Sequence, residues 1–308
     1  MTSNDPSNAL ILHHYETSPF SEKVRVMLGI KGLAWRSVIQ PVIMPKPELV
    51  PLTGGYRRIP VLQIGADIYC DTQTILAEIE ARHPIPSMVR GADWAVNLWA
   101  DRLFFQATVA VVFGEIGDAV PKTFIADREK LSGRPFDINA MKAAAAPMKA
   151  QWRAHAAWIE AGLANSDFLG GATPSLADVA ACMNVWWLSK AAPPAAAALL
   201  QGLPRTVAWR ERMAAFGHGQ PSTMSGAEAL QIAKTAAPIA GASSDAADPS
   251  GLSPGMAVSI SADDYGRDPI TGTLVVVTAD RVTIARTDAE LGVLNVHFPR
   301  AGYVLSAA

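Results

Sequence analysis

The hydrophobic period of this chain changes twice along its length, and those changes limit its fold more than any single motif does. Up to about residue 83, short strand-like apolar runs alternate with helix-like stretches. From about 90 to 236 only helical periods remain, and beyond 254 apolar and β-branched residues recur at the period of two typical of strands. A chain of 308 residues has room for two or three domains. We therefore expect an α+β protein with one domain for each zone.

The first domain, expected over residues 8–84, follows the order β-α-β-loop-β-β-α. Strands are expected over 9–13, 35–39, 60–64 and 67–70, and helices over 19–32 and 72–82. Gly65-Ala66, between the last two strands, is a hairpin signal. The segment 41–56 is rich in Pro and Gly and is expected to be a loop with one helical turn at most.

The second domain, over residues 90–236, is expected to be entirely helical. Helices are expected over 93–118, 139–163, 176–190 and 205–216, with a further short helix over 225–235. Pro121, Pro193-Pro194 and the segment 217–221 are expected to separate them, because Pro and Gly interrupt helices.

Residues 237–254 are mostly small and are expected to form a linker. The third domain, over residues 255–308, places four or five short strands in few residues, which predicts a small SH3-like β-barrel. From residue 241 onward, eight acidic residues stand against four basic ones. Nucleic-acid binding needs a basic face, so an acidic barrel argues against it.

Charge and composition exclude further classes. The formal net charge is -2, which gives no general attraction to nucleic acid or anionic membranes. No apolar run approaches the ~18–20 residues that span a bilayer, and residues 1–8 lack the pattern of a signal peptide. Cys70 and Cys182 lie far apart and match no metal or redox spacing, as is usual in a reducing compartment. We expect a cytoplasmic protein without a metal, a nucleic-acid partner or a membrane.

Ser18 precedes Pro19 at the expected start of the first helix. Serine is a preferred N-cap and proline a preferred first helical residue, so a helix start by itself accounts for the pair. A functional interpretation uses the same geometry, because a hydroxyl and free backbone N–H groups at a helix N-terminus bind anions, including a thiolate. Such donors lower the pKa of a thiol. Ser18 would then donate a hydrogen bond to the sulfur of a substrate and would not itself be the nucleophile.

Two further pairs also allow a structural and a functional interpretation. Pro60 opens an expected strand, where proline is tolerated. If the Ile59–Pro60 bond is cis, the backbone of Ile59 turns away from the sheet and can pair with an extended peptide ligand. Asp71 and Thr72 are ordinary helix caps. The same acidic group and hydroxyl could also hold the ammonium and carboxylate of an amino-acid head group.

Taken together, these spacings resemble a known family. The β-α-β-loop-β-β-α order with Ser18-Pro-Phe-Ser21, Ile59-Pro60 and Asp71-Thr72 resembles the thioredoxin-like N-terminal domain of cytosolic glutathione S-transferases, in their bacterial, serine-type form. The helical zone resembles their C-terminal domain, and Thr173–Asp178 resembles their buried capping box. Over about residues 9–220, the resemblance implies a detoxifying transferase with glutathione as co-substrate, a small hydrophobic electrophile as second substrate, and a homodimer.

The resemblance also implies roles for single residues. Ser18 matches the residue that stabilises the glutathione thiolate, and Tyr15 is its rival as the activator of the thiol. Ser175 and Asp178 match structural caps. The residues expected to bind glutathione are Phe20, Arg58, Ile59, Pro60, Asp71 and Thr72, and those expected near a hydrophobic substrate pocket are Tyr15, Trp99 and Phe105.

Other functions stay open because the chain departs from the family pattern. Ser18 and Ser21 replace both cysteines of a Cys-x-x-Cys pair, which disfavours thiol–disulfide exchange. Thr53-Gly-Gly55 is faintly similar to bacterial glutathione-dependent β-etherases, and the third domain is foreign to the ordinary transferase. A glutathione-dependent β-etherase or lyase, or a non-catalytic binding protein of the same fold, are the alternatives.

Overall fold

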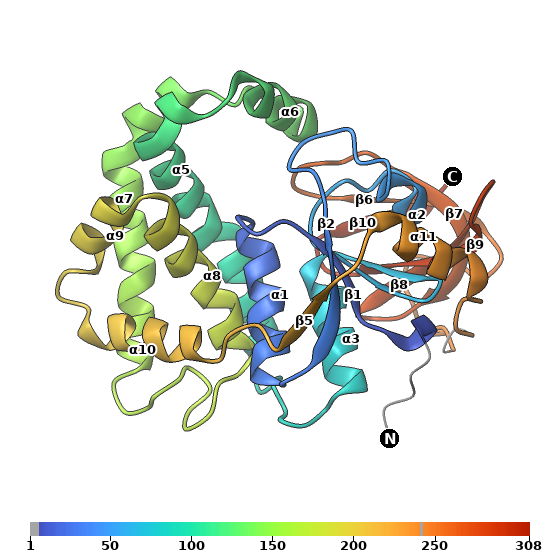
Figure 1. The fold of residues 1–308 in the computed structure, drawn as a ribbon, viewed down its shortest axis with the longest axis horizontal. Coiled ribbons are helices and arrows are strands. Elements are labelled where there is room, and N and C mark those ends of the chain that lie inside the picture. The colour runs from blue at the N-terminus through green and yellow to red at the C-terminus, as the bar shows by residue number, and fades with distance from the viewer. Residues whose placement is uncertain (1–5, 241–242) are drawn as a thin grey trace.

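A single sheet of ten strands runs through the molecule in the order β10-β6-β7-β8-β9-β4-β3-β1-β2-β5. The structure, a computed structural model, describes residues 6–240 and 243–308. Figure 1 shows the helices from α5 to α10 gathered on one side of the molecule and the strands on the other, with α1 and α3 between them.

The first domain has the expected order and a thioredoxin-like fold. Its elements are η1 (Pro6–Asn8), β1 (Ile11–His14), α1 (Pro19–Ile30), β2 (Ala34–Ile39), α2 (Val50–Thr53), β3 (Val61–Ile64), β4 (Asp67–Cys70) and α3 (Thr72–Arg82). Strand β1 pairs in parallel with β2 and antiparallel with β3, and β4 forms a hairpin with β3. Because β3 and β4 are buried on both faces, their apolar residues contact helices on one side and further strands on the other.

The second zone is helical over most of its length. Its elements are α4 (Asp93–Trp99), a π-helical segment η2 (Ala100–Phe104), α5 (Phe105–Ile116), η3 (Gly117–Ala119), α6 (Lys122–Ser132), α7 (Ile138–Gly162), α8 (Leu176–Ala191), α9 (Pro193–Leu200) and α10 (Pro204–Ala215). Helices α6 and α9 are not among the expected ones. Pro193-Pro194, interpreted as a break, instead occupies the first turn of α9, where a missing N–H costs nothing.

The end of the expected all-helical zone returns to the first domain. Residues 220–223 form a short strand, β5 (Gln220–Thr223), where the sequence indicated only a break, and β5 pairs in parallel with β2. The expected last helix follows as α11 (Gly226–Thr235), which packs Ala229 against Ile11 and Val38. All four residues of β5 are exposed, so the sequence has no hydrophobic alternation that would predict this strand.

The chain ends in an added β domain. Its strands are β6 (Ala257–Ala262), β7 (Ile270–Val277), β8 (Arg281–Asp288), β9 (Gly292–Pro299) and β10 (Tyr303–Ala307). They pair antiparallel in succession from β6 to β9, and β10 returns to pair with β6. The domain is not a free appendage, because β9 pairs in parallel with β4, so that the added strands and those of the first domain form one sheet. Of the expected linker 237–254, residues 241 and 242 lie outside the described part of the chain.

A buried polar network fixes this junction between β4 and β9. His297 lies with its Nε2 2.9 Å from the Asp67 carboxylate and its Nδ1 2.9 Å from the Thr283 hydroxyl. Its ring stacks on Tyr69 with centroids 4.3 Å apart. Asp67 also accepts the N–H of Ile239, from the start of the expected linker. The sequence alone offered His297 no partner, because these contacts join residues up to 230 positions apart.

One helical stretch among the described residues is long and apolar enough to cross a membrane by length and composition, which the sequence analysis did not anticipate. It is Asp93–Ala119, the run of α4, η2 and α5, and 44% of its most apolar window is buried inside the protein. In this fold the stretch packs against α7 and α8 within the helical domain.

Candidate functional site

Ser18 caps helix α1. Its side chain is buried, its backbone is extended, and its hydroxyl accepts a hydrogen bond from the N–H of Ser21 at 3.1 Å. Pro19 occupies the first helical position, as the sequence predicts. The N–H of Ser18 donates to the carbonyl of Tyr15 at 3.3 Å. Burial raises the pKa of Tyr15, so its phenol stays protonated near neutral pH. A second hydroxyl therefore comes from the residue three positions before the cap of α1.

The six residues expected to bind glutathione line one pocket. The Ile59–Pro60 peptide bond is cis. The pocket is small, with a volume of about 40 Å³. Its lining consists of Phe20, Tyr56, Arg58, Ile59, Pro60, Asp71, Thr72, Gln73, Leu98, Asp101, Arg102, Asp264 and Tyr265. The sequence thus indicated most of the first-domain wall of the pocket, without Tyr56 and Gln73, and missed the walls contributed by α4, η2 and the added β domain.

Asp71 has an unusual backbone. Its φ of 75° and ψ of 143° make it the one non-glycine residue with positive φ in the described part of the chain. Its carboxylate accepts the N–H of Gln73 at 2.9 Å, which caps α3. Such a conformation costs on the order of 1–3 kcal/mol and concentrates at functional sites. The carboxylate also accepts a hydrogen bond from the hydroxyl of Tyr303 at 3.2 Å. Burial raises the pKa of that phenol well above its usual range, so the hydroxyl keeps the proton that it donates.

A buried ion pair lies at the base of the pocket and joins the first domain to the helical domain. Lys23 on α1 is fully buried, and its ammonium donates to both carboxylate oxygens of Asp101 at 2.7 and 2.8 Å and to Asn97 at 2.7 Å. Burial raises the pKa of Asp101, and the charge of Lys23 opposes that rise. Asp101 lies in the π-helical segment η2, a kind of helical irregularity that often occurs at functional sites.

A cluster of cations adjoins Tyr15. Asp127 on α6 pairs with Arg57 at 2.5 Å and with Arg128 at 3.2 Å. Lys46 lies over the ring of Tyr15 with its Nζ 5.8 Å from the centroid, and burial lowers its pKa to about 8. Two arginines thus share one carboxylate, and Lys46 adds a third cation beside the capped start of α1. Lys46 and Arg128 were missed in the sequence, because they come from a loop and a helix without a recognisable pattern.

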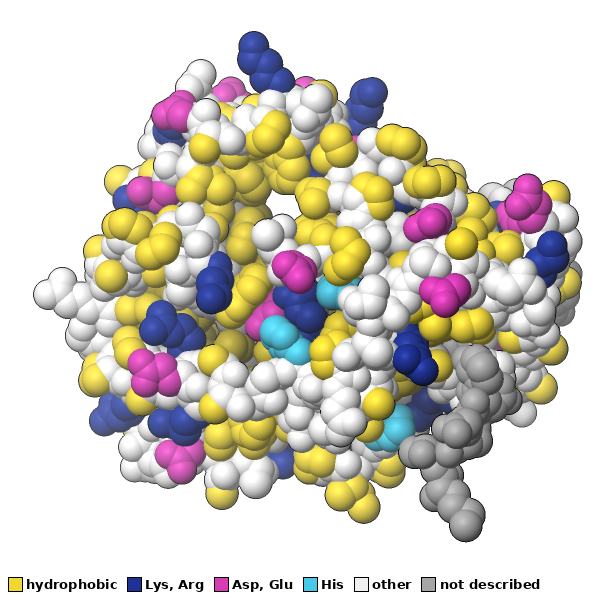
Figure 2. Space-filling view, in the orientation of Figure 1, with side chains coloured by type: hydrophobic (Ala, Val, Ile, Leu, Met, Phe, Trp, Pro, Cys, Tyr) yellow, Lys and Arg dark blue, Asp and Glu magenta, His cyan; other side chains and the backbone are white. Residues whose placement is uncertain are grey.

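Aromatic side chains continue from the pocket into the helical domain. The ring of Phe20 contacts that of Phe105 at 4.7 Å, and Phe105 stacks on Trp187 at 5.6 Å. Trp187 contacts Phe113 at 5.8 Å, which meets Phe136 at 4.9 Å. Figure 2 shows hydrophobic side chains around a hollow that, in the orientation of Figure 1, lies between α5 and α6 and the strand-bearing half of the molecule.

Of the three residues expected near a substrate pocket, Phe105 and Tyr15 lie beside the site and Trp99 does not. The ring of Trp99 stacks on Phe104 at 5.3 Å, and its Nε1 donates to His155 of α7 at 3.2 Å. Trp99 therefore packs between α4 and α7. The helical register, which the sequence does not fix, turns it away from the pocket.

Ser175 and Asp178 form the expected capping box. The Asp178 carboxylate is fully buried and accepts the N–H of Ser175 at 2.9 Å, and also those of Leu169 at 2.7 Å and Gly170 at 2.9 Å. The indole N–H of Trp209 donates to it at 2.8 Å. Four donors from three segments meet on one side chain, which accounts for a structural and not a catalytic role.

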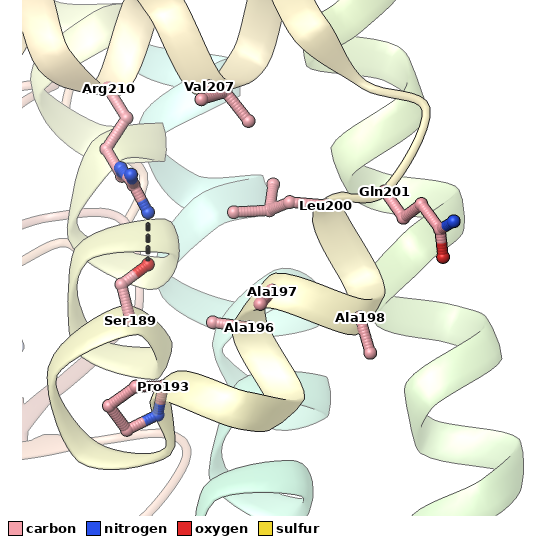
Figure 3. Close-up of a pocket in the computed structure, with 9 residues that line it drawn as sticks. All are labelled: Ser189, Pro193, Ala196, Ala197, Ala198, Leu200, Gln201, Val207 and Arg210. Carbon is pink, nitrogen blue, oxygen red and sulfur yellow. Dashed lines mark hydrogen bonds between the residues drawn. The ribbon is translucent and has the colours of Figure 1, made fainter.

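A larger groove lies far from these residues. It has a volume of about 580 Å³ and lies between α8, α9 and α10, lined mostly by alanine, leucine and proline. Figure 3 shows its one charged residue, Arg210, donating to Ser189 at 3.0 Å. None of the expected site residues lines it. Because Arg210 is already paired with Ser189 and the third polar side chain, Gln201, pairs with neither, this groove lacks convergent groups for chemistry.

Comparison with known protein families agrees with the site in the first domain. Residues 12–87 match the model of the glutathione S-transferase N-terminal domain, and residues 142–212 match that of the C-terminal domain. No curated protein sequence matches the chain at the level required for a relative.

Among solved structures, the chain is similar over 98% of its length to a GST-like protein from Pseudomonas syringae, with 36% identity, full coverage of that chain and a TM-score of 0.81. A glutathione S-transferase from Methylobacterium radiotolerans, in complex with glutathione sulfonate, aligns with 70% of this chain and 97% of its own at 21% identity and a TM-score of 0.51. The β-etherase LigF from Sphingobium aligns with 67% of this chain and 95% of its own at 16% identity and a TM-score of 0.52. At such identities, the similarity to the last two proteins shows a shared fold. The similarity to the Pseudomonas protein extends over nearly the whole length of both chains, including the added β domain.

Proposed function

We propose a function for this chain, which belongs to the glutathione S-transferase family. It binds glutathione in the pocket beside Ser18 and activates the glutathione thiolate for attack on a hydrophobic electrophile. The observation that carries the proposal is the convergence of all six expected glutathione-binding residues on one pocket at the start of α1. The strained backbone of Asp71, within that pocket, supports a role in binding.

In this mechanism Ser18 and the positive end of α1 hold the sulfur as a thiolate. The hydroxyl of Ser18 donates to the sulfur, and the protonated phenol of Tyr15 is the rival donor. Asp71 holds the ammonium of the γ-glutamyl group, and the backbone of Ile59 pairs with the cysteinyl unit. The aromatic side chains that begin at Phe20 and Phe105 receive the electrophile. Most of the rate enhancement then comes from positioning and from stabilising the thiolate.

The assay is a titration with reduced glutathione at neutral pH, followed by the ultraviolet absorbance of the thiolate. A hydrogen bond to a charged group is worth about 1.5–3 kcal/mol, so Ser18→Ala should raise the thiol pKa of bound glutathione and lower the rate about tenfold to a hundredfold. Thr17→Ala, at the exposed neighbouring position, is the matched control and should behave as wild type. Tyr15→Phe tests the rival activator. Glutathione that binds without ionising, or an unchanged rate in Ser18→Ala, would refute the role of Ser18.

A non-catalytic binding protein of the same fold is the second candidate, and one observation favours it. The free volume of about 40 Å³ is far below the roughly 300 Å³ of ordinary ligand pockets. A protein that binds no glutathione, or binds it without lowering its thiol pKa, in the titration above would fit this candidate.

We further propose a cytoplasmic homodimer. Leu98, Leu103 and Trp158 are exposed hydrophobic side chains on α4, η2 and α7, with Trp158 60% exposed. The ring of Trp99 lies 5.9 Å from that of Trp158. Large apolar side chains left exposed on neighbouring elements favour an interface. Sedimentation of wild type and Trp158→Glu tests this proposal, because a charge at the centre of an apolar contact should release monomers.

A further inference from the structure

The loop between β6 and β7, residues 263–269, crosses the pocket described above. Its residues Asp264 and Tyr265 are part of the pocket lining, although they lie about 200 positions from Arg58 in the sequence. The loop belongs to the added β domain, which the family models do not cover. Its position raises the question of what it does in a site for glutathione.

On the first-domain side, the loop engages Arg58. The Asp264 carboxylate pairs with the Nη2 of Arg58, and the Tyr265 ring lies under the guanidinium at 4.0 Å. The Arg58 side chain is 12% exposed. Arg58 is the one cation among the residues expected to bind glutathione, and its guanidinium can pair with a carboxylate of that ligand. In this structure Arg58 is already paired with a carboxylate of the chain itself, that of Asp264.

On the helical side, the loop is held at two points. Arg102 of η2 pairs with Asp263 at 2.6 Å and with Asp264 at 3.5 Å. The N–H of Gly266 donates to the carbonyl of Leu131 on α6 at 2.8 Å. The loop therefore bridges the first domain and the helical domain across the pocket mouth.

Gly266 is required for this close approach. Its φ is +60°, and a Cβ at this position would lie 2.9 Å from Leu131 Cδ1 and 3.1 Å from Arg58 Nε. Both atoms belong to flexible side chains that can shift, so the main cost of any larger residue is the positive φ, which L side chains rarely adopt. The sequence thus fits the loop tightly into the site.

The loop leaves too little room for glutathione. The remaining volume of about 40 Å³ is far below the roughly 300 Å³ of ordinary ligand pockets. A tripeptide needs many times that volume, so glutathione and the loop cannot occupy the pocket together in this arrangement.

Apart from Tyr265, polar contacts hold the loop. Asp263 and residues 267–269 are exposed. Segments with few buried apolar contacts open at low free energy. The two ends of the loop continue into paired strands, β6 and β7, so it can move without disturbing the added β domain.

We propose that the β6–β7 loop, residues 263–269, is an intramolecular strap that closes the glutathione site. In the closed state Asp264 forms the ion pair with Arg58 that a carboxylate of the ligand would otherwise form. The site opens when the strap leaves, and glutathione and the strap compete for Arg58. The inference rests on the proposed function, because it describes the regulation of that same site. The apparent dissociation constant is then the intrinsic one divided by the open fraction, so a strap closed nine-tenths of the time weakens binding about tenfold.

The experiment compares glutathione binding by calorimetry in the full-length wild type and in variants of the strap. Asp264→Asn removes the charge that pairs with Arg58 and keeps the size of the side chain. Gly266→Ala disfavours the closed strap by a different route, because alanine is strained at a φ of +60°. Asp268→Asn is the matched control, since Asp268 lies in the same loop, is exposed, and has no hydrogen bond or ion pair with any residue that the structure describes.

Hydrogen exchange of the loop amides is the second measurement. If the strap competes, Asp264→Asn and Gly266→Ala bind glutathione about tenfold more tightly than wild type, Asp268→Asn binds as wild type does, and saturating glutathione speeds exchange at Gly266. A wild type that does not bind while the two opening variants do would support the strap further.

Two other results overturn the proposal, and they are distinguishable. If all variants bind glutathione equally, or if Asp264→Asn binds more weakly and glutathione slows exchange at Gly266, the loop is no competitor while the proposed function stands. If neither wild type nor the opening variants bind glutathione at millimolar concentration, the proposed function fails and the competition fails with it.

Discussion

Replacing Lys23 by methionine should destabilise the fold strongly at neutral pH. The Lys23 side chain is 0% exposed and that of Asp101 is 11% exposed, so the substitution leaves a buried carboxylate with only the Asn97 amide, at 3.2 Å. Breaking a buried pair in this way costs about 3–5 kcal/mol. The carboxyl group limits the loss by taking up a proton. At pH 7 this costs about 4 kcal/mol for a group with a reference pKa near 3.9, at about 1.4 kcal/mol per pH unit.

The dependence of this effect on pH has a definite sign. Burial already raises the folded-state pKa of Asp101, so its contribution to stability is full at low pH and is lost as pH rises through that pKa. Lys23→Met removes the opposing charge and raises the folded-state pKa further. The free energy lost by the variant should therefore fall from about 4 kcal/mol at pH 7 to about 1.5 kcal/mol at pH 5.

Urea unfolding followed by tryptophan fluorescence measures both values. Lys142→Met is the control, because Lys142 pairs with Asp118 in an ion pair that is exposed, worth at most about 1 kcal/mol. The double variant Lys23→Met/Asp101→Leu should recover much of the loss, since it leaves no buried charge. A loss below 1 kcal/mol at pH 7 for Lys23→Met, or a loss that grows as the pH falls, would refute this reasoning.

Three further changes test other parts of the structure. Asp178→Ala leaves four donors without their acceptor, each worth about 1–3 kcal/mol when buried, so the variant should be insoluble or melt far below wild type, and a melting temperature within a few degrees would contradict the shared-acceptor role. Tyr303→Phe removes one hydrogen bond to Asp71 and should cost about 1 kcal/mol in urea unfolding; an unchanged midpoint would show that the bond contributes nothing. His297→Leu leaves buried Asp67 and Thr283 without their ring partner, so unfolding should become easier by about 2–4 kcal/mol, and a stabilised variant would argue against the network as the fastener between β4 and β9.

The first domain could be predicted closely because its elements follow local rules. Strand β4 and helix α3 have the expected bounds to within one residue, and Ser18 and Pro19 mark the start of α1 by their own conformational preferences. The capping box at Ser175 is equally local, since both partners lie within three residues of each other. Where a signal depends only on neighbours along the chain, the sequence carries it in full.

The elements that the sequence missed lack such local signals. Strand β5 is exposed and polar, so it exists because the edge of β2 offers it hydrogen bonds. Helix α6 is mostly polar and exposed, and its role emerges only from Asp127 and Leu131, which reach the site from it. In both cases the partner, and not the segment, decides the structure.

The sequence by itself determined the family, the three zones and the first-domain residues of the candidate site, because periodicity, caps and motif spacing are properties of short segments. Only the tertiary structure decided that the added β domain continues the central sheet through β9 and β4, and that its loop meets Arg58. Pairing between strand edges and between side chains about 200 positions apart depends on where the chain brings them, which no local pattern records.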